Sequence, residues 1–134
     1  MTHPILSLQA TLVAALAADA ALTALIGADA VFDAPPKGRR PPYVVVARHD
    51  LAPRDGDETP GHEHRVVLHA WAAEASRKAV LAIADSVVAA LTGADLDDEL
   101  AVTHRRHERT ETATDTGSGF ARAAIALRFF TEPA

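Results

Sequence analysis

The sequence predicts an α+β fold, a mainly antiparallel sheet of about four to five strands packed against two main helices, with a long C-terminal β-hairpin. Three observations lead to this prediction. Apolar residues recur every three to four positions in two alanine-rich segments, which is the spacing of amphipathic helices. Valine-rich runs lie between these segments and are typical of strands. Two alternating segments around a Thr/Ser/Gly-rich bend close the chain, as in a hairpin.

Composition limits the classes of protein that this chain can represent. Its 134 residues suit one domain, so residues 1–134 are expected to form a single unit. Hydrophobic residues make up 49% of the chain but aromatic residues only 4%, so the core must consist of Ala, Val, Leu and Ile. The net charge of −5 disfavours nucleic-acid binding as the main role. The absence of cysteine excludes disulfides and thiolate metal sites, and it fits synthesis in a cytoplasm.

The N-terminal segment is predicted to form two consecutive helices. Pro4 suits a first helical turn, and Asp19 is placed to cap a second short helix, Ala20–Ile26, which Gly27 ends. Gln9 and Asp19 interrupt the apolar run, so residues 5–26 are interpreted as neither an export signal nor a membrane span. The predicted buried face of the first helix contains Ile5, Leu8, Leu12 and Leu16.

The middle of the chain alternates strands with proline-rich connections. Val31-Phe32 is predicted to be a short strand, and four prolines exclude regular structure over residues 35–42. Tyr43–His49 is predicted to be a central strand because it is strongly apolar and β-branched. The polar residues 50–62 are expected to form a mobile loop, and Glu63–Ala72 to return as a strand.

The second half is predicted to contain one long helix and the hairpin. The helix is expected over Glu74–Leu91, with strands at Leu100–Thr110 and Phe120–Thr131 around a bend at Thr114–Gly119. Odd-numbered residues of the last strand are expected to face the core, whereas its even face carries charge and two aromatic rings. The expected buried stripe of the helix contains Val80, Ile83, Val87 and Leu91, widened by Leu81, Ala84 and Val88.

No pattern in the sequence indicates catalysis or a bound metal. The seven histidines lack an HExxH motif or a carboxylate triad, and they are interpreted as solvated or as contacting a partner. Acidic residues cluster in two predicted loops, where they are expected to serve solvation. No serine lies in a GxSxG setting. We therefore expect no enzyme, no cofactor and no metal site.

The basic run at 104–109 allows two interpretations. On an extended strand Arg105, His107 and Arg109 would share one side, while residues 104, 106 and 108 would share the other. A strand with charge on both faces is not wholly buried inside a monomer. The run is therefore either a solvated hairpin arm or a surface that meets a neighbouring subunit or passing DNA.

The order of these segments resembles that of the tail-completion (tail terminator) proteins of tailed phages and gene transfer agents. The resemblance covers nearly the whole chain. It is carried by Pro4-Ile5-Leu6 with Leu8, Asp19–Gly27, Val31–Pro36, Pro42–Val46, His64–Trp71, the helix Ala75–Leu91 and the closing Ala123–Thr131 strand, which ends in Phe-Phe-Thr-Glu.

The resemblance implies a virion protein at the tail–head junction, forming a hexameric ring that caps the tail tube and ends its polymerisation. It implies as partners further copies of the chain, the major tail tube protein and a head-side neck or stopper protein. DNA would pass through the lumen without specific binding, and no membrane is involved. A neck or head-closure protein at the same junction is the alternative. From the residues themselves, the predicted subunit or tail-tube interface contains Arg39, Arg40, Arg54, Asp57, Arg105, His107, Arg109, Arg122 and Arg128.

Overall fold

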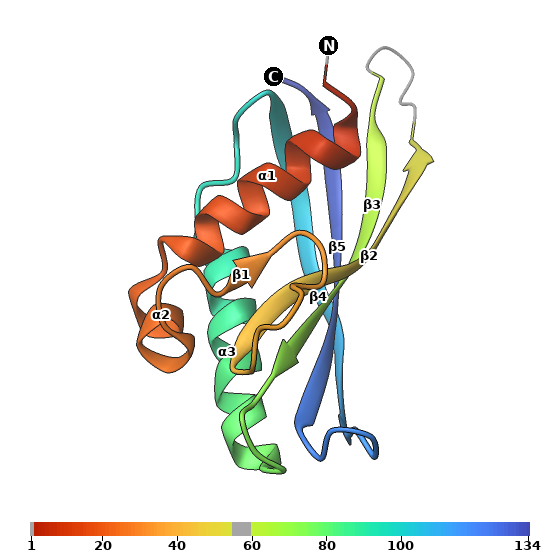
Figure 1. Ribbon diagram of the computed structural model, residues 1–134. Helices are drawn as coiled ribbons and strands as arrows, with labels where there is room; N and C mark the ends of the chain where they lie inside the picture. The colour runs from red at the N-terminus through yellow and green to blue at the C-terminus, as the bar shows by residue number, and fades with distance from the viewer. Residues whose placement is uncertain (1, 55–59) are drawn as a thin grey trace.

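The computed structural model describes residues 2–54 and 60–134 and shows a two-layer α+β fold (Figure 1). Helices α1 and α3 lie on one face of a five-stranded sheet whose strand order is β1-β2-β3-β5-β4. Only β1 and β2 pair in parallel, so the predicted fold class is confirmed. The elements are α1 (Pro4–Ala17), α2 (Ala20–Ile26), β1 (Val31–Phe32), β2 (Tyr43–Pro53), β3 (His62–Trp71), α3 (Arg77–Gly93), β4 (Leu100–Thr114) and β5 (Ala121–Pro133).

The ends of the helices follow local capping. Asp19 accepts a hydrogen bond from the amide of Leu22 and so begins α2, and Gly27 ends it, both as predicted. Helix α3 begins at Arg77 rather than at the predicted Glu74, because the Ser76 side chain accepts from the amide of Ala79. The carbonyl of Glu74 instead accepts from the amide of Ala121, which ties this segment to the start of β5.

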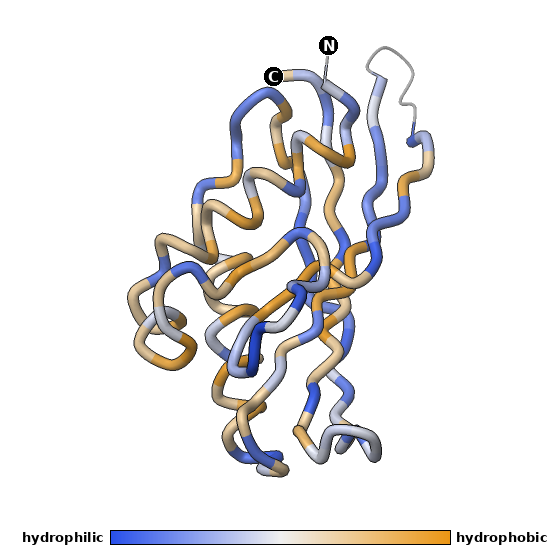
Figure 2. The backbone as a smooth tube through the Cα atoms, viewed as in Figure 1, coloured by the Kyte–Doolittle hydropathy of each residue, from blue (hydrophilic) through white to orange (hydrophobic). Residues whose placement is uncertain are grey.

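The core lies between the helices and one face of the sheet. Alternate residues of β5, from Ala121 to Thr131, are buried, which confirms the prediction for the odd positions. The predicted stripe on α3 is buried at Val80, Ile83, Ala84, Val87 and Leu91, whereas Val88 is half-buried and Leu81, which is 37% exposed, does not widen it. Figure 2 shows hydrophobic colour along the helices and the middle of the strands, and hydrophilic colour over the acidic connection from α3 to β4.

Residues 50–62 do not form the predicted loop throughout. Strand β2 continues to Pro53, which pairs with His62 at the start of β3, so these strands extend well past the apolar run. Residues 55–59 lie outside the described part of the chain. The prediction of a central strand holds for Val44 and Val45, which have neighbours on both sides, but β3 is the middle strand of the sheet. A paired strand tolerates polar residues on a face that no helix covers.

Gly61, directly before β3, lies close to the backbone of Arg54 and to the end of β5. A Cβ atom at Gly61 would lie 2.8 Å from the carbonyl oxygen of Arg54 and 3.2 Å from that of Thr131. Gly61→Ala is therefore expected to lower the free energy of unfolding by about 1–3 kcal/mol, because backbone must shift to relieve the overlap. Urea denaturation measures this effect. Gly93→Ala is the control, since its Cβ would meet no atom within 4 Å, and equal losses for both variants would contradict the explanation.

Candidate functional site

The face of the sheet that points away from the helices, here called the open face, has no covering helix in the described part of the chain (Figure 1). Residues paired directly across antiparallel strands point to the same side, so the register assigns each residue to a face. The middle of the open face consists of Arg48 and Asp50 on β2, Glu63, Arg65 and Val67 on β3, Ala126, Arg128 and Phe130 on β5, and His104, Arg106 and Arg109 on β4.

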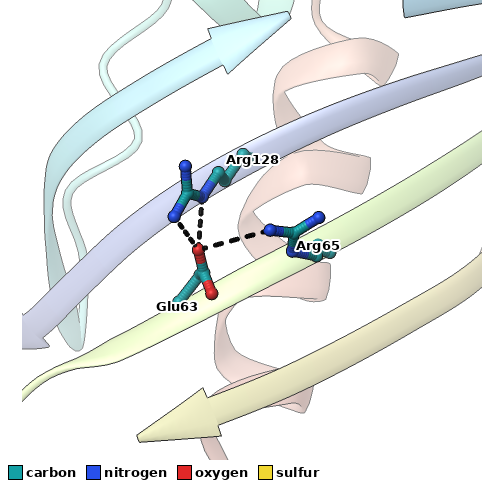
Figure 3. Close-up of polar contacts among 3 residues, drawn as sticks. All are labelled: Glu63, Arg65 and Arg128. Atoms are coloured by element: carbon teal, nitrogen blue, oxygen red, sulfur yellow. Dashed lines mark hydrogen bonds and ion pairs between the residues drawn. The ribbon is translucent and has the colours of Figure 1, made fainter. Parts of the chain in front are cut away.

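Three arginines lie side by side across three neighbouring strands of the open face. Arg128 on β5 is directly opposite Arg65 on β3 and Arg106 on β4. Like charges in this arrangement repel each other unless an anion lies between them. Glu63 supplies one such anion. Its Oε1 accepts from Arg128 and lies 3.9 Å from Nη2 of Arg65 (Figure 3).

A shallow hollow of about 400 Å³ lies beside this row. Its floor includes Val67 and Ala126, and charged side chains from β2, β3 and β4 surround it. Arg48 donates to Asp50 over 2.7 Å, and Arg109 lies 3.3 Å from Glu111, with both arginine side chains more than 70% exposed. Such exposed pairs contribute little to stability, so they leave these arginines available for other contacts. The hollow thus combines an apolar floor with an exposed, charged rim.

Arginine also stacks on the aromatic rings of the open face. The guanidinium carbons of Arg54 and Arg128 lie 3.9 and 4.8 Å from the centre of the Phe130 ring. Arg122 lies 6.0 Å from the Trp71 ring. These contacts hold the guanidinium groups along the surface. Aromatic and arginine side chains are the types enriched in protein–protein interfaces.

The prediction that Arg105, His107 and Arg109 share one side is wrong. A β-bulge between His107 and Arg109 adds one residue to β4 and turns Arg109 to the open face. Arg105 and His107 lie on the helix side, opposite the buried residues Phe129 and Leu127. His107 forms a 2.8 Å hydrogen bond with Thr110 there.

Arg105 caps the C-terminal end of α3. Its guanidinium donates to the carbonyl oxygen of Leu91 over 3.1 Å and to that of Ala94. These groups belong to the end of a helix, where carbonyls lack partners within the helix and the dipole is negative. The structure therefore gives Arg105 a contact inside the subunit, and its predicted role in an interface stays a prediction.

Arg105→Met is expected to lower the free energy of unfolding by about 1–3 kcal/mol, because it leaves two half-buried carbonyls without a charged donor. Arg106→Met removes the same charge from the next residue, which is exposed on the open face. We expect that control to change stability by less than about 0.5 kcal/mol. Thermal or urea unfolding of the two variants tests this, and similar losses would refute the capping role.

The other predicted interface residues lie in different places. Arg54, Arg109, Arg122 and Arg128 lie on or at the edge of the open face. Arg39 and Arg40 are exposed in the proline-rich connection, where Arg39 lies 5.3 Å from the Phe32 ring, so the structure does not bring them to the other arginines. Asp57 lies outside the described residues.

Two histidines meet on the helix side of the sheet, His49 on β2, which is half-buried, and His64 on β3, which is buried. His64 is 0% exposed, and its Nδ1 lies 2.8 Å from Nε2 of His49 while its Nε2 lies 2.9 Å from Oγ1 of Thr131. Burial lowers the pKa of each of these two histidines from 6.5 to about 4. The interpretation of the histidines as solvated or partner-contacting is therefore wrong for His64.

Within residues 2–54 and 60–134, no three His, Asp or Glu side chains come close enough to hold a metal ion. In the same ranges, no single helix has the length and hydropathy of a membrane span. Helices α1 and α2 have the required length and hydropathy only when taken together, and the pair is bent by 77°.

Sequence reasoning missed the contributions of β2 and β3 to the open face. Arg48, Glu63, Arg65 and Arg106 were not predicted as site residues, although all four belong to the arginine row or its rim. The available signal was the alternation Glu63, Arg65, Val67, which places charge on one face of a strand whose other face is apolar.

Comparison with known proteins gives matches to a protein family and to solved structures. The family model described as Tail completion protein gp17 matches residues 10–132. A chain of the solved structure described as "Virion of native gene transfer agent (GTA) particle" superposes with a TM-score of 0.85 and 28% identity, covering 98% of this chain and 99% of that chain. No curated protein sequence matches.

Proposed function

The chain belongs to the Tail completion protein gp17 family, and from this premise we propose that it forms a ring that caps the tail tube, ends tube polymerisation and joins the tail to the head. A structural role in tail completion follows from the family, whose model matches residues 10–132. The ring, its hexameric state and its position at the tail–head junction are the proposed parts. The single domain expected over residues 1–134 is part of the same proposal.

The observation that carries this proposal is the likeness to a chain of a gene transfer agent virion. It extends over 98% of this chain at a TM-score of 0.85. The transfer of a virion setting to this chain is a proposal by structural analogy, because a shared fold alone does not fix a function. The resemblance that the sequence suggested is confirmed at the level of the family.

The open face fits a protein that works by assembly. Its half-buried valine and alanine floor, rimmed by arginines, is an arrangement expected of a surface that another protein covers. We therefore propose further copies of the chain, the tail tube protein and a head-side neck protein as partners, with no catalytic activity. DNA would cross the lumen without specific binding, favoured by the acidic net charge of −5.

Removing the gene from a strain that produces the particles tests this function. We expect tails of variable length without attached heads, because nothing would end tube growth or present a joining surface. Electron micrographs give the distribution of tail lengths, and the intact gene supplied on a plasmid should restore it. Tails of normal length on particles with empty, leaking heads would instead identify a head-closure protein and contradict the proposal.

A further inference from the structure

Charge is divided between the two layers of this protein. Residues 2–34 and 73–99, which contain the three helices and their connections, carry nine acidic and two basic side chains, a net charge of −7. Strands β2, β3, β4 and β5 carry five acidic and seven basic side chains, a net charge of +2. A single subunit thus has an acidic helix layer and a basic sheet layer.

The helix layer has a hollow of its own. It measures about 370 Å³ and lies between α1 and the connection from α3 to β4. Ala10 and Ala14 of α1 form its apolar side, and Asp95, Asp97 and Asp98 form its acidic side. The three carboxylates are exposed, and no basic side chain lines this hollow in the described part of the chain. We call it the acidic hollow.

We propose that the open face of one copy docks on the acidic hollow of the next copy, so that arginines from the row enter between the aspartates. Arg65 is well suited to this contact, because its side chain is 58% exposed and its nearest carboxylate oxygen lies 3.9 Å away. The apolar floor of the open face would meet the alanines of α1. This inference rests on the proposed function, since it names the surfaces that close the ring.

The open face suits a protein partner better than nucleic acid. Asp50, Glu63 and Glu111 lie among its arginines, and they would repel the phosphates of a nucleic acid. A protein partner carries its acidic groups at fixed positions. These groups can lie away from Asp50, Glu63 and Glu111 and pair with the arginines between those residues. The acidic hollow on the other layer of the same chain offers such a surface.

The proposed contact joins two different surfaces, so it is head-to-tail. A growing row keeps a free open face at one end and a free acidic hollow at the other. It stops growing only when the rotation between copies closes it into a ring. A contact between two identical open faces would stop at a dimer. This difference gives the proposal a direct experimental signature.

Engineered cysteines test the contact, because the natural chain contains none. Arg65→Cys and Asp98→Cys are made singly and together in the full chain, and particles carrying them are treated with a short bismaleimide. We expect the double variant to give a ladder of dimers, trimers and larger products on a denaturing gel. Each single variant should remain monomeric, and an equal mixture of the two should give dimers only.

Charge exchange provides the control. The cysteines of an Asp98→Cys and Arg48→Cys pair report the contact by cross-linking. Adding Arg65→Glu to this pair should reduce cross-linking at least about tenfold, because it puts like charges face to face. Adding Asp97→Arg should restore most of the product. Lys78→Glu reverses an exposed charge on α3 outside both surfaces and should leave the ladder unchanged.

Several results would overturn the inference. Dimers of the Arg65→Cys single variant would show that two open faces meet each other. Binding of duplex DNA that Arg65→Glu abolishes would assign the open face to nucleic acid. A chain found at the tail end without any ladder would refute this interface and leave the proposed function intact, whereas a chain missing from the particles would refute the proposed function itself.

Discussion

Lowering the pH from 7 to 4 is expected to reduce the free energy of unfolding by about 3 kcal/mol through His49 and His64. This is roughly half of what two independent shifts of this size would give, because His49 is only half-buried and solvent screens its charge. The folded pKa of each is lowered by burial to about 4, below the ordinary value of 6.5. Between these values the unfolded chain binds more protons than the folded chain, so stability falls with falling pH. The contribution is fully present above pH 6.5 and is lost as the pH falls towards 4. One unit of pKa shift corresponds to about 1.4 kcal/mol.

The geometry explains why the neutral form is preferred. In the neutral form, the bonds from His64 to His49 and Thr131 can each have one donor and one acceptor. A second proton on His49 would place a donor at its Nδ1, which is buried and has no hydrogen-bond partner among the described residues. A proton on His64 would place a charge where no solvent reaches.

Urea titrations at half-unit pH steps measure this loss. In His49→Gln/His64→Gln the slope of unfolding free energy against pH should fall by more than half between pH 6.5 and 4, even if the variant is less stable at pH 7. His104→Gln, an exposed change on the open face, is the control and should keep the natural slope. An unchanged slope in the double variant would contradict the role of the buried pair.

Phe129→Ala is expected to lower the free energy of unfolding by about 3–5 kcal/mol, whereas Phe130→Ala should cost only about 1 kcal/mol. The two residues are adjacent on β5 and point to opposite faces. Phe129 is fully buried in the core, so its removal leaves a cavity. Phe130 is partly exposed on the open face, where its ring contacts Arg54 and Arg128.

Phe130→Ala, which costs little stability, should have a large effect on assembly. Phe130→Ala should leave a folded subunit that enters particles poorly, because the open face loses an aromatic ring and the support of two arginines. Quantifying the subunit in purified particles against its soluble amount in the cell measures this. If Phe130→Ala particles contain normal amounts of the chain, the open face does not contribute to assembly.

Local patterns in the sequence predicted most of the fold. Helix periodicity, the Asp19 cap and the alternation along β5 are properties of neighbouring residues, and each agrees with the structure. Pairing between distant residues was harder to predict. Residues 50–53 begin a segment, 50–62, whose composition as a whole is that of a polar loop, yet these four residues are strand because they pair with β3.

The candidate site was predicted only in part for the same reason. The β4 bulge that separates Arg109 from Arg105 and His107 depends on the register with β5, which strict alternation does not reveal. The burial of His64 depends on His49 and Thr131, which are 15 and 67 residues away in the chain. Arg105 looked like a surface charge because the end of α3 that it caps comes from another part of the sequence.

Locating the chain in intact particles by cryo-electron microscopy tests the central claim most directly. The account predicts a closed ring of copies between the last ring of the tail tube and the head-side neck, with the open face of each copy against the helix layer of the next. Density for this chain only inside the capsid or at the distal tip of the tail, or its absence from purified particles, would contradict it.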